Sequence, residues 1–211
     1  MAVLALAVMA AAGGLGCDDQ GSEGVPATAR AFAHVAAGYV GEPEYATAID
    51  VPFYVQFNGD FVGADLRTQL GNPAKDPARG GEIYPGDSVK VMAGTEHDGP
   101  DPTSCEDADP YPYCEPLDGG GAMTWSPEDP GEDPGYVEVG VRKGDVTVVV
   151  VFSGPHITGD PRTLDLPVTI DQLVDIARDE RVDLTTTQAA VDAGADLDYW
   201  EETAPPVGPV G

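Results

Sequence analysis

The amino-acid sequence predicts an α+β domain with a mainly antiparallel sheet, and three observations point to that fold class. The strongest is the run DVTVVVVFS at residues 145–153, which is rich in β-branched side chains and apolar on both alternating faces. Several shorter segments alternate apolar and polar residues, and an amphipathic helix pattern follows at residues 170–181. A strand that is apolar on both faces aggregates when it is exposed. We therefore expect residues 145–153 at the centre of the sheet, covered by the helix.

The first part of the predicted domain reads as a helix followed by a hairpin. Residues 27–41 have a modest amphipathic helical pattern. Residues 49–57 alternate apolar and polar side chains, as in a strand with one buried face. The dipeptide Asn58-Gly59 then predicts a type I′ turn, from which residues 61–66 return as the second strand.

Three further segments have the alternation of strands that pair with the valine run. Residues 87–92 alternate clearly, and residues 122–125 form a short candidate strand. Residues 136–141 place valines on one face, and the Arg-Lys-Gly sequence at 142–144 predicts a tight turn into residues 145–153. These last two segments should form a hairpin.

The helix pattern near the C-terminus carries its own start signal. Thr169 is a predicted N-cap, and Gln172 stands three residues later as its capping-box partner. Thr185 and Gln188 repeat this spacing and predict a short second helix that ends at Gly194.

The charge balance excludes one class of partner. The chain has 37 Asp and Glu against 10 Lys and Arg, which gives a formal net charge of −27. Such a surface repels the phosphate backbone of nucleic acids and anionic lipid headgroups. We expect no nucleic-acid partner.

The N-terminus predicts export. Residues 1–16 are continuously apolar, but as a helix they reach only about 24 Å, short of the roughly 30 Å hydrocarbon core, so they are predicted to be a signal peptide. The sequence before Cys17 resembles the lipobox of bacterial lipoproteins, in which the cysteine is lipidated. Residues 17–26 then form an acidic tether, residues 27–202 a single domain, and residues 203–211 a disordered tail. Plain secretion without a lipid is the alternative.

The two later cysteines predict a disulfide. Cys105 and Cys114 would close a ten-residue loop, and their spacing fits no zinc motif. Loop-closure entropy gives such a crosslink a stabilisation of roughly 2–3 kcal/mol. Because disulfides persist in oxidising compartments, the pair agrees with export.

Acidic loops around the cysteine pair raise the hypothesis of a cation site. Hard cations such as Ca²⁺ bind six to eight oxygen ligands, and crowded carboxylates repel one another until they are neutralised. The candidate ligands are Asp98, Asp101, Glu106, Asp107 and Asp109. No EF-hand loop motif occurs, so calcium is an alternative and not the preferred cofactor.

A catalytic pair is a third hypothesis. Ser153 and His156 lie three residues apart at the end of the valine run, and they are the candidate Ser/His pair of an exported hydrolase. There is no G-x-S-x-G elbow and no identifiable carboxylate to orient the histidine. The residues therefore favour a protein without a catalytic site.

Residues 105–184 resemble a group of exported actinobacterial lipoproteins of unassigned function. The shared features are the cysteine pair, the segment EPLDG at 115–119, the hairpin of residues 136–153 and a closing helix with the pattern QL-x-x-IA. The resemblance implies a small envelope domain and carries no catalytic residue. The preferred prediction is a non-enzymatic lipoprotein, anchored to the outer face of the cell membrane through Cys17, that binds a protein or a small ligand.

Overall fold

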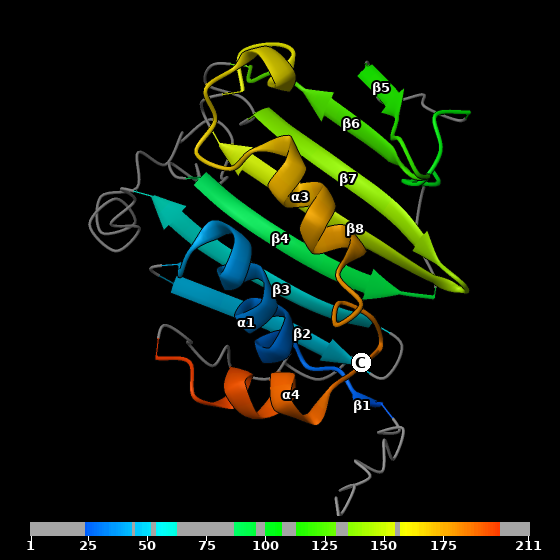
Figure 1. The fold of residues 1–211 in the computed structure, drawn as a ribbon. Coiled ribbons are helices and arrows are strands. Elements are labelled where there is room, and N and C mark those ends of the chain that lie inside the picture. Colours follow the sequence, from blue (N-terminus) through cyan, green and yellow to red (C-terminus); the bar gives the residue numbers. More distant parts are fainter. Residues whose placement is uncertain are drawn as a thin grey trace, which may run out of the picture.

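The computed structural model describes residues 24–43, 45–51, 54–62, 87–95, 100–106, 113–129, 135–154 and 157–198. Within these residues the chain forms helices, a seven-stranded sheet and a two-stranded sheet (Figure 1). Every strand pair is antiparallel. The predicted α+β class is confirmed.

The large sheet places the valine run at its centre. Its strands are β2 (Tyr45–Val51), β3 (Tyr54–Val62), β4 (Asp87–Gly94), β5 (Tyr113–Pro116), β6 (Ala122–Ser126), β7 (Gly135–Lys143) and β8 (Val146–Gly154). Their order in space is β2-β3-β4-β8-β7-β6-β5, so β8 has three strands on each side.

Both faces of β8 are largely buried, as the sequence predicts, and Val151 is the valine between Thr147 and Phe152 that keeps an intermediate exposure. Val148, Val150 and Phe152 are fully buried within the main hydrophobic core. On the opposite face Thr147 and Val149 are only 7% and 3% exposed. The central position of this strand pairs both of its edges, and the helices packed on the sheet cover the face that carries Val148, Val150 and Phe152.

Helices cover one face of the large sheet (Figure 1). They are α1 (Ala29–Val40), α3 (Ile170–Arg178) and α4 (Gln188–Ala195), with a short 3₁₀ helix, η1 (Pro161–Thr163), before α3. α3 packs on β7 and β8, α1 packs on β2 and β3, and α4 packs on α1. The core lies between this helical layer and the sheet.

α3 forms where its start signal predicts. The Thr169 side chain accepts a hydrogen bond from the Gln172 backbone, and the Gln172 side chain accepts one from the Thr169 backbone at 2.8 Å. Leu173 and Ile176 are fully buried against the sheet, which stabilises the fold by roughly 1.5–3 kcal/mol per side chain. The capping box and the apolar stripe thus act together.

The first hairpin differs from the prediction. Val51 pairs with Tyr54, so the chain reverses between these residues and not at Asn58-Gly59. Asn58 and Gly59 lie inside β3 and pair on both sides, with β2 and with β4. The two residues between Val51 and Tyr54 lie outside the described part of the chain.

The turn between β7 and β8 and the start of α4 also differ from the prediction. Lys143 pairs with Val146, so the β7–β8 connection is Gly144 and Asp145, and Arg142 still belongs to β7. The N-cap of α4 is Thr187 and not Thr185. The shift arises because residues 185–186 are used in a strand.

That strand, β9 (Thr185–Thr186), pairs with β1 (Val25–Pro26). Val25 and Pro26 were expected in the flexible tether of residues 17–26, so the structured part of the chain begins earlier than predicted. The hydrogen bond from the Ala27 backbone to the carbonyl of Leu184, at 3.0 Å, extends this contact.

The loop of residues 100–106 packs against the other face of the sheet. A Cβ atom on Gly140 of β7 would overlap the carbonyl group of Pro102 in this loop, so only glycine allows the close approach. Asp101 also forms an ion pair with Arg142, with 3.1 Å between Oδ2 and Nη2. The disulfide loop is thereby fixed to the sheet.

Candidate functional site

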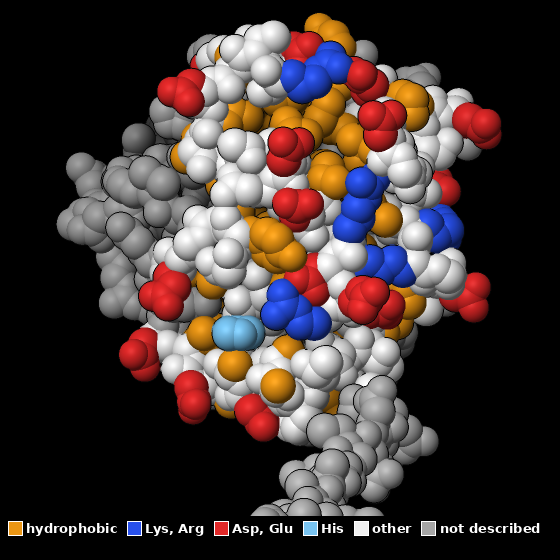
Figure 2. All heavy atoms as spheres, viewed as in Figure 1, with side chains coloured by type: hydrophobic (Ala, Val, Ile, Leu, Met, Phe, Trp, Pro, Cys, Tyr) orange, Lys and Arg blue, Asp and Glu red, His pale blue; other side chains and the backbone are white. Residues whose placement is uncertain are grey.

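A hollow lies in the described surface between η1 and the start of α3. Its volume is about 290 Å³, and it is lined by Pro161, Arg162, Leu164, Asp165, Leu166, Thr169, Ile170 and Asp171. In Figure 2 this region shows hydrophobic atoms at the base of a depression, with charged side chains around it. We call it the η1–α3 hollow.

Arg162 is held firmly at one side of the hollow. Its Nε and Nη2 donate to the two carboxylate oxygens of Asp160 at 2.9 and 2.7 Å, and its Nη1 donates to Glu115 on β5. The hydrogen bonds from the Arg162 side chain lower the pKa of Asp160. Because both acceptors are occupied by this guanidinium, Arg162 fixes η1 to the edge of the sheet.

Two aromatic rings extend the site toward β5. Tyr113 of β5 stacks on Trp125 of β6, with 5.2 Å between ring centroids and 11° between the planes. The guanidinium carbon of Arg162 lies 5.6 Å from the centroid of a Trp125 ring, within cation–π range. Trp125 is 7% exposed and Tyr113 is 47% exposed, so Tyr113 offers an aromatic surface to solvent.

The hollow is acidic. Asp165 and Asp171 line it, are exposed, and have no ion-pair partner among the residues that the structure describes. Glu115 and Asp160 lie beside the hollow and form ion pairs with Arg162. With them, four carboxylates stand against the guanidinium of Arg162, which gives a formal charge of −3. The local charge therefore has the same sign as the whole chain.

The walls of the hollow are fixed from two directions. The capping box holds the first turn of α3, and Gln172 Nε2 also donates to the carbonyl of Tyr39 in α1 at 2.6 Å. On the other side Asp160 caps η1 by accepting from the Arg162 backbone at 3.1 Å. These contacts give the hollow a preformed shape, as ligand sites usually have.

A second polar cluster joins α1, α3 and the β7–β8 hairpin. Asp179 accepts a hydrogen bond from Tyr39 Oη at 2.8 Å and from Arg181 Nε at 2.9 Å. Burial alone would raise the pKa of Asp179, but the bonds from Arg181 and Tyr39 outweigh it and lower that pKa to about 2. Lys143 Nζ donates to the carbonyls of Asp179 and Val182, so the cluster ties helices to sheet.

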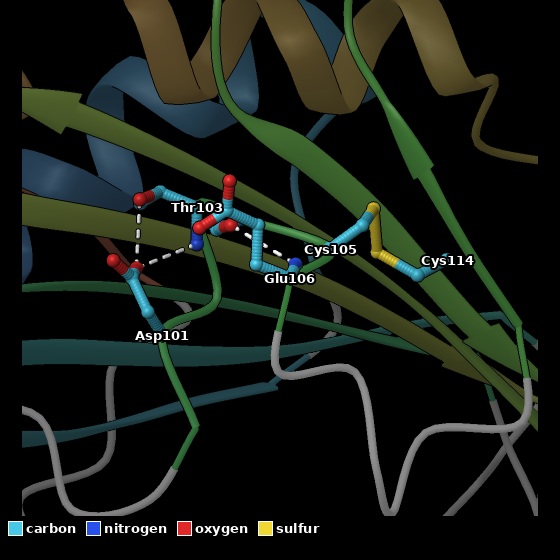
Figure 3. Close-up of a disulfide and its surroundings, with 6 residues drawn as sticks. Asp101, Thr103, Cys105, Glu106 and Cys114 are labelled. Carbon is cyan, nitrogen blue, oxygen red and sulfur yellow. Dashed lines mark hydrogen bonds between the residues drawn. A yellow bond between two sulfur atoms is a disulfide. The ribbon is translucent and has the colours of Figure 1, made fainter.

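The predicted disulfide forms. Cys105 and Cys114 are joined with 5.6 Å between their Cα atoms (Figure 3). Within the neighbouring loop Asp101 Oδ1 accepts from the Thr103 backbone at 2.9 Å and from the Thr103 hydroxyl at 2.7 Å. Glu106 is exposed.

The structure describes two of the five proposed calcium ligands, Asp101 and Glu106. Asp101 is occupied by Thr103 and Arg142, while Asp98, Asp107 and Asp109 lie outside the described residues. In the described part of the chain no three His, Cys, Asp or Glu side chains are grouped so that they could hold a metal ion.

The other predicted site residues are placed only in part. Ser153 Oγ donates to the carbonyl of Gly135 at 3.1 Å. His156, its proposed catalytic partner, lies outside the described residues, and so does Cys17.

Sequence reasoning missed the residues that build the hollow. Arg162 stands 37 positions from Trp125 in the chain, and no motif marks their contact. A faint signal was the Asp160-Pro161 pair, since an N-cap followed by proline is typical of a helix start. The pairing of Tyr113 with Trp125 depends on strand register, which a single sequence specifies weakly for short strands.

One buried polar pair lies on the sheet face opposite the helices. Glu138 of β7 pairs in register with Thr124 of β6, and each has a buried side-chain oxygen without a hydrogen-bond partner among the residues that the structure describes. Burial raises the pKa of Glu138, and the positive charge of Lys90 opposes that rise. This carboxyl group is a local weakness in the sheet.

Comparisons with known proteins give no family assignment: no protein-family model, no curated protein and no solved structure matches this chain. No helix within the described part of the chain has the length and the apolar character needed to cross a membrane.

Proposed function

We propose that this chain is a non-enzymatic lipoprotein of the cell envelope whose extracytoplasmic domain binds a partner or ligand. The observation that carries the binding part is the η1–α3 hollow with the Tyr113–Trp125 stack beside it. A preformed concave site next to an exposed aromatic ring is the usual form of a binding surface.

The Cys105–Cys114 disulfide supports the location outside the cytoplasm, since such crosslinks are rare where thiols are kept reduced. The apolar residues 1–16 and the cysteine that follows them support lipid anchoring. Neither feature depends on the hollow.

Cell fractionation tests the anchoring. We expect the full chain, expressed in a bacterium that processes lipoproteins, to sediment with membranes and to be digested by protease added to intact cells. The variant Cys17→Ala should appear in the medium. The double variant Cys105→Ser/Cys114→Ser is the matched control and should remain membrane-bound. Wild-type protein in the cytosol, protected from protease, would contradict the proposal.

Site-specific photocrosslinking tests the binding surface. A benzoylphenylalanine placed at Tyr113 should form a discrete adduct on intact cells. The same group at Asp192, which is exposed on α4, is the control and should form none. Equal labelling at both positions, or none at Tyr113, would argue against this surface.

A further inference from the structure

We propose that the η1–α3 hollow receives a basic side chain, lysine or arginine, presented by a partner protein. This inference rests on the proposed binding function and names the chemistry of the group that is bound. Three features of the hollow support such an occupant, namely its size, its apolar base and its charge.

The size limits the occupant. A volume of about 290 Å³ lies just below the range for small-molecule pockets, roughly 300–1,000 Å³. It suits a single side chain and not a folded element of a partner.

The lining matches an amphipathic side chain. Leu164, Leu166 and Ile170 supply apolar surface, and each belongs to or packs against the hydrophobic core. Asp165 and Asp171 add exposed carboxylates to the same hollow. Lysine and arginine have an apolar stem that covers hydrophobic surface and a charged head that stays near water or an anion.

The charges decide between a cation and an anion. The hollow also contains the N-terminus of α3, which carries about half a positive charge, and the guanidinium of Arg162. Both favour an anion. Two carboxylates of the lining, Asp165 and Asp171, oppose them. Asp160 and Glu115 beside the hollow already accept the hydrogen bonds of Arg162, so the formal charge summed over all these groups stays near −2.5 by this estimate. A cation is therefore favoured.

The test uses the full chain in detergent with the substitution Trp200→Phe, so that Trp125 is the only tryptophan. Trp125 contacts Arg162 at the hollow and should report binding by a change in fluorescence. The probe is a blocked glycine heptapeptide with lysine at its centre. Matched peptides carry norleucine or glutamate there, and n-butylamine is the free-amine probe.

We expect the lysine peptide to bind at least tenfold more tightly than the norleucine peptide, and the glutamate peptide not to bind. The double variant Asp165→Asn/Asp171→Asn should weaken binding of the lysine peptide about tenfold. Its control is Asp175→Asn/Asp196→Asn, which removes the same charge from exposed positions outside the hollow and should bind like wild type. Binding should also weaken as salt is raised.

A second variant guards against a folding defect. Asp165 lies outside every helix, so Asp165→Lys should leave the melting temperature unchanged and abolish binding of the lysine peptide.

Equal binding of the lysine and norleucine peptides, stronger binding of the glutamate peptide, or butylamine binding as tight as the lysine peptide would each overturn the proposal. So would the absence of any binding. These peptide-binding results are independent of the outcomes of the fractionation and crosslinking experiments. The basic-side-chain proposal can therefore fail while the proposed function stands.

Discussion

Glu138 shows how a single side chain can weaken a sheet that is otherwise well packed. It lies on β7 between β6 and β8, and its Oε1 atom is buried with no hydrogen-bond partner in the described part of the chain. A buried polar group without a partner costs about 1–3 kcal/mol. The residue is tolerated because neighbouring β-branched side chains supply far more stabilisation than it removes.

Replacing this carboxyl group should stabilise the protein at neutral pH. The pKa of Glu138 in the folded protein is raised from its ordinary value of 4.5. Above pH 4.5 the unfolded chain ionises more readily than the folded one, so stability falls as the pH rises. Well below pH 4.5 the carboxyl group is protonated in both the folded and the unfolded chain, and this penalty vanishes. We expect Glu138→Gln to raise stability by about 1 kcal/mol at pH 7.5 and to have little effect at pH 4. Thermal melts across this range, with exposed Glu106→Gln as the control, measure the difference. A gain that is independent of pH would contradict this explanation.

Asp179 has the opposite pH dependence. Its pKa is lowered from 3.8 to about 2, so its contribution is complete above pH 4 and is lost as the pH falls toward 2. Asp179→Asn should therefore reduce stability by about 2 kcal/mol at pH 7, as expected for hydrogen bonds to a charged group. Denaturant titrations should show that the loss of unfolding free energy relative to wild type becomes smaller from pH 7 to pH 4 and pH 2. The control variant Asp175→Asn, at an exposed position, should show no such loss at any of these pH values.

At the scale of elements, the packing of α4 on α1 depends on Gly194. A Cβ atom there would lie 2.6 Å from the carbonyl oxygen of Arg30, so the two helix backbones meet without a side chain between them. Backbone atoms cannot move aside as a flexible side chain can.

Two glycine-to-alanine substitutions should therefore differ in sign. Gly194→Ala should destabilise by about 1–3 kcal/mol, because α4 must move off α1. Gly38→Ala, within α1 with open space around it, should stabilise by about 0.5–1 kcal/mol through helix propensity. Chemical denaturation measures the change in unfolding free energy of both variants. A change of the same sign for both would disprove the close-packing explanation.

Local signals predicted some elements well and others poorly, for physical reasons. The Thr169 capping box and the β-branched run in β8 were readable because neighbours in sequence determine them. The turn at Asn58-Gly59 was wrong because pairing on both sides of β3 overrides a local turn preference. The hollow and the Tyr113–Trp125 stack depend on contacts between distant segments, which no single window of sequence records.

For the whole molecule, the disulfide adds stability that depends on redox conditions. Closing the loop from Cys105 to Cys114 should contribute roughly 2–3 kcal/mol by loop-closure entropy. We expect a reductant, or the double variant Cys105→Ser/Cys114→Ser, to lower the melting temperature, and the reductant to have no further effect on that variant. A wild-type melting temperature that is the same with and without reductant would contradict a stabilising crosslink.

Intact mass spectrometry of the full chain, purified from the membranes of a lipoprotein-processing bacterium, tests the envelope function most directly. We expect one species that begins at Cys17, carries a lipid on that residue and lacks the two hydrogens removed by the Cys105–Cys114 bond. A species that still begins at Met1 with all three thiols free would contradict the proposal.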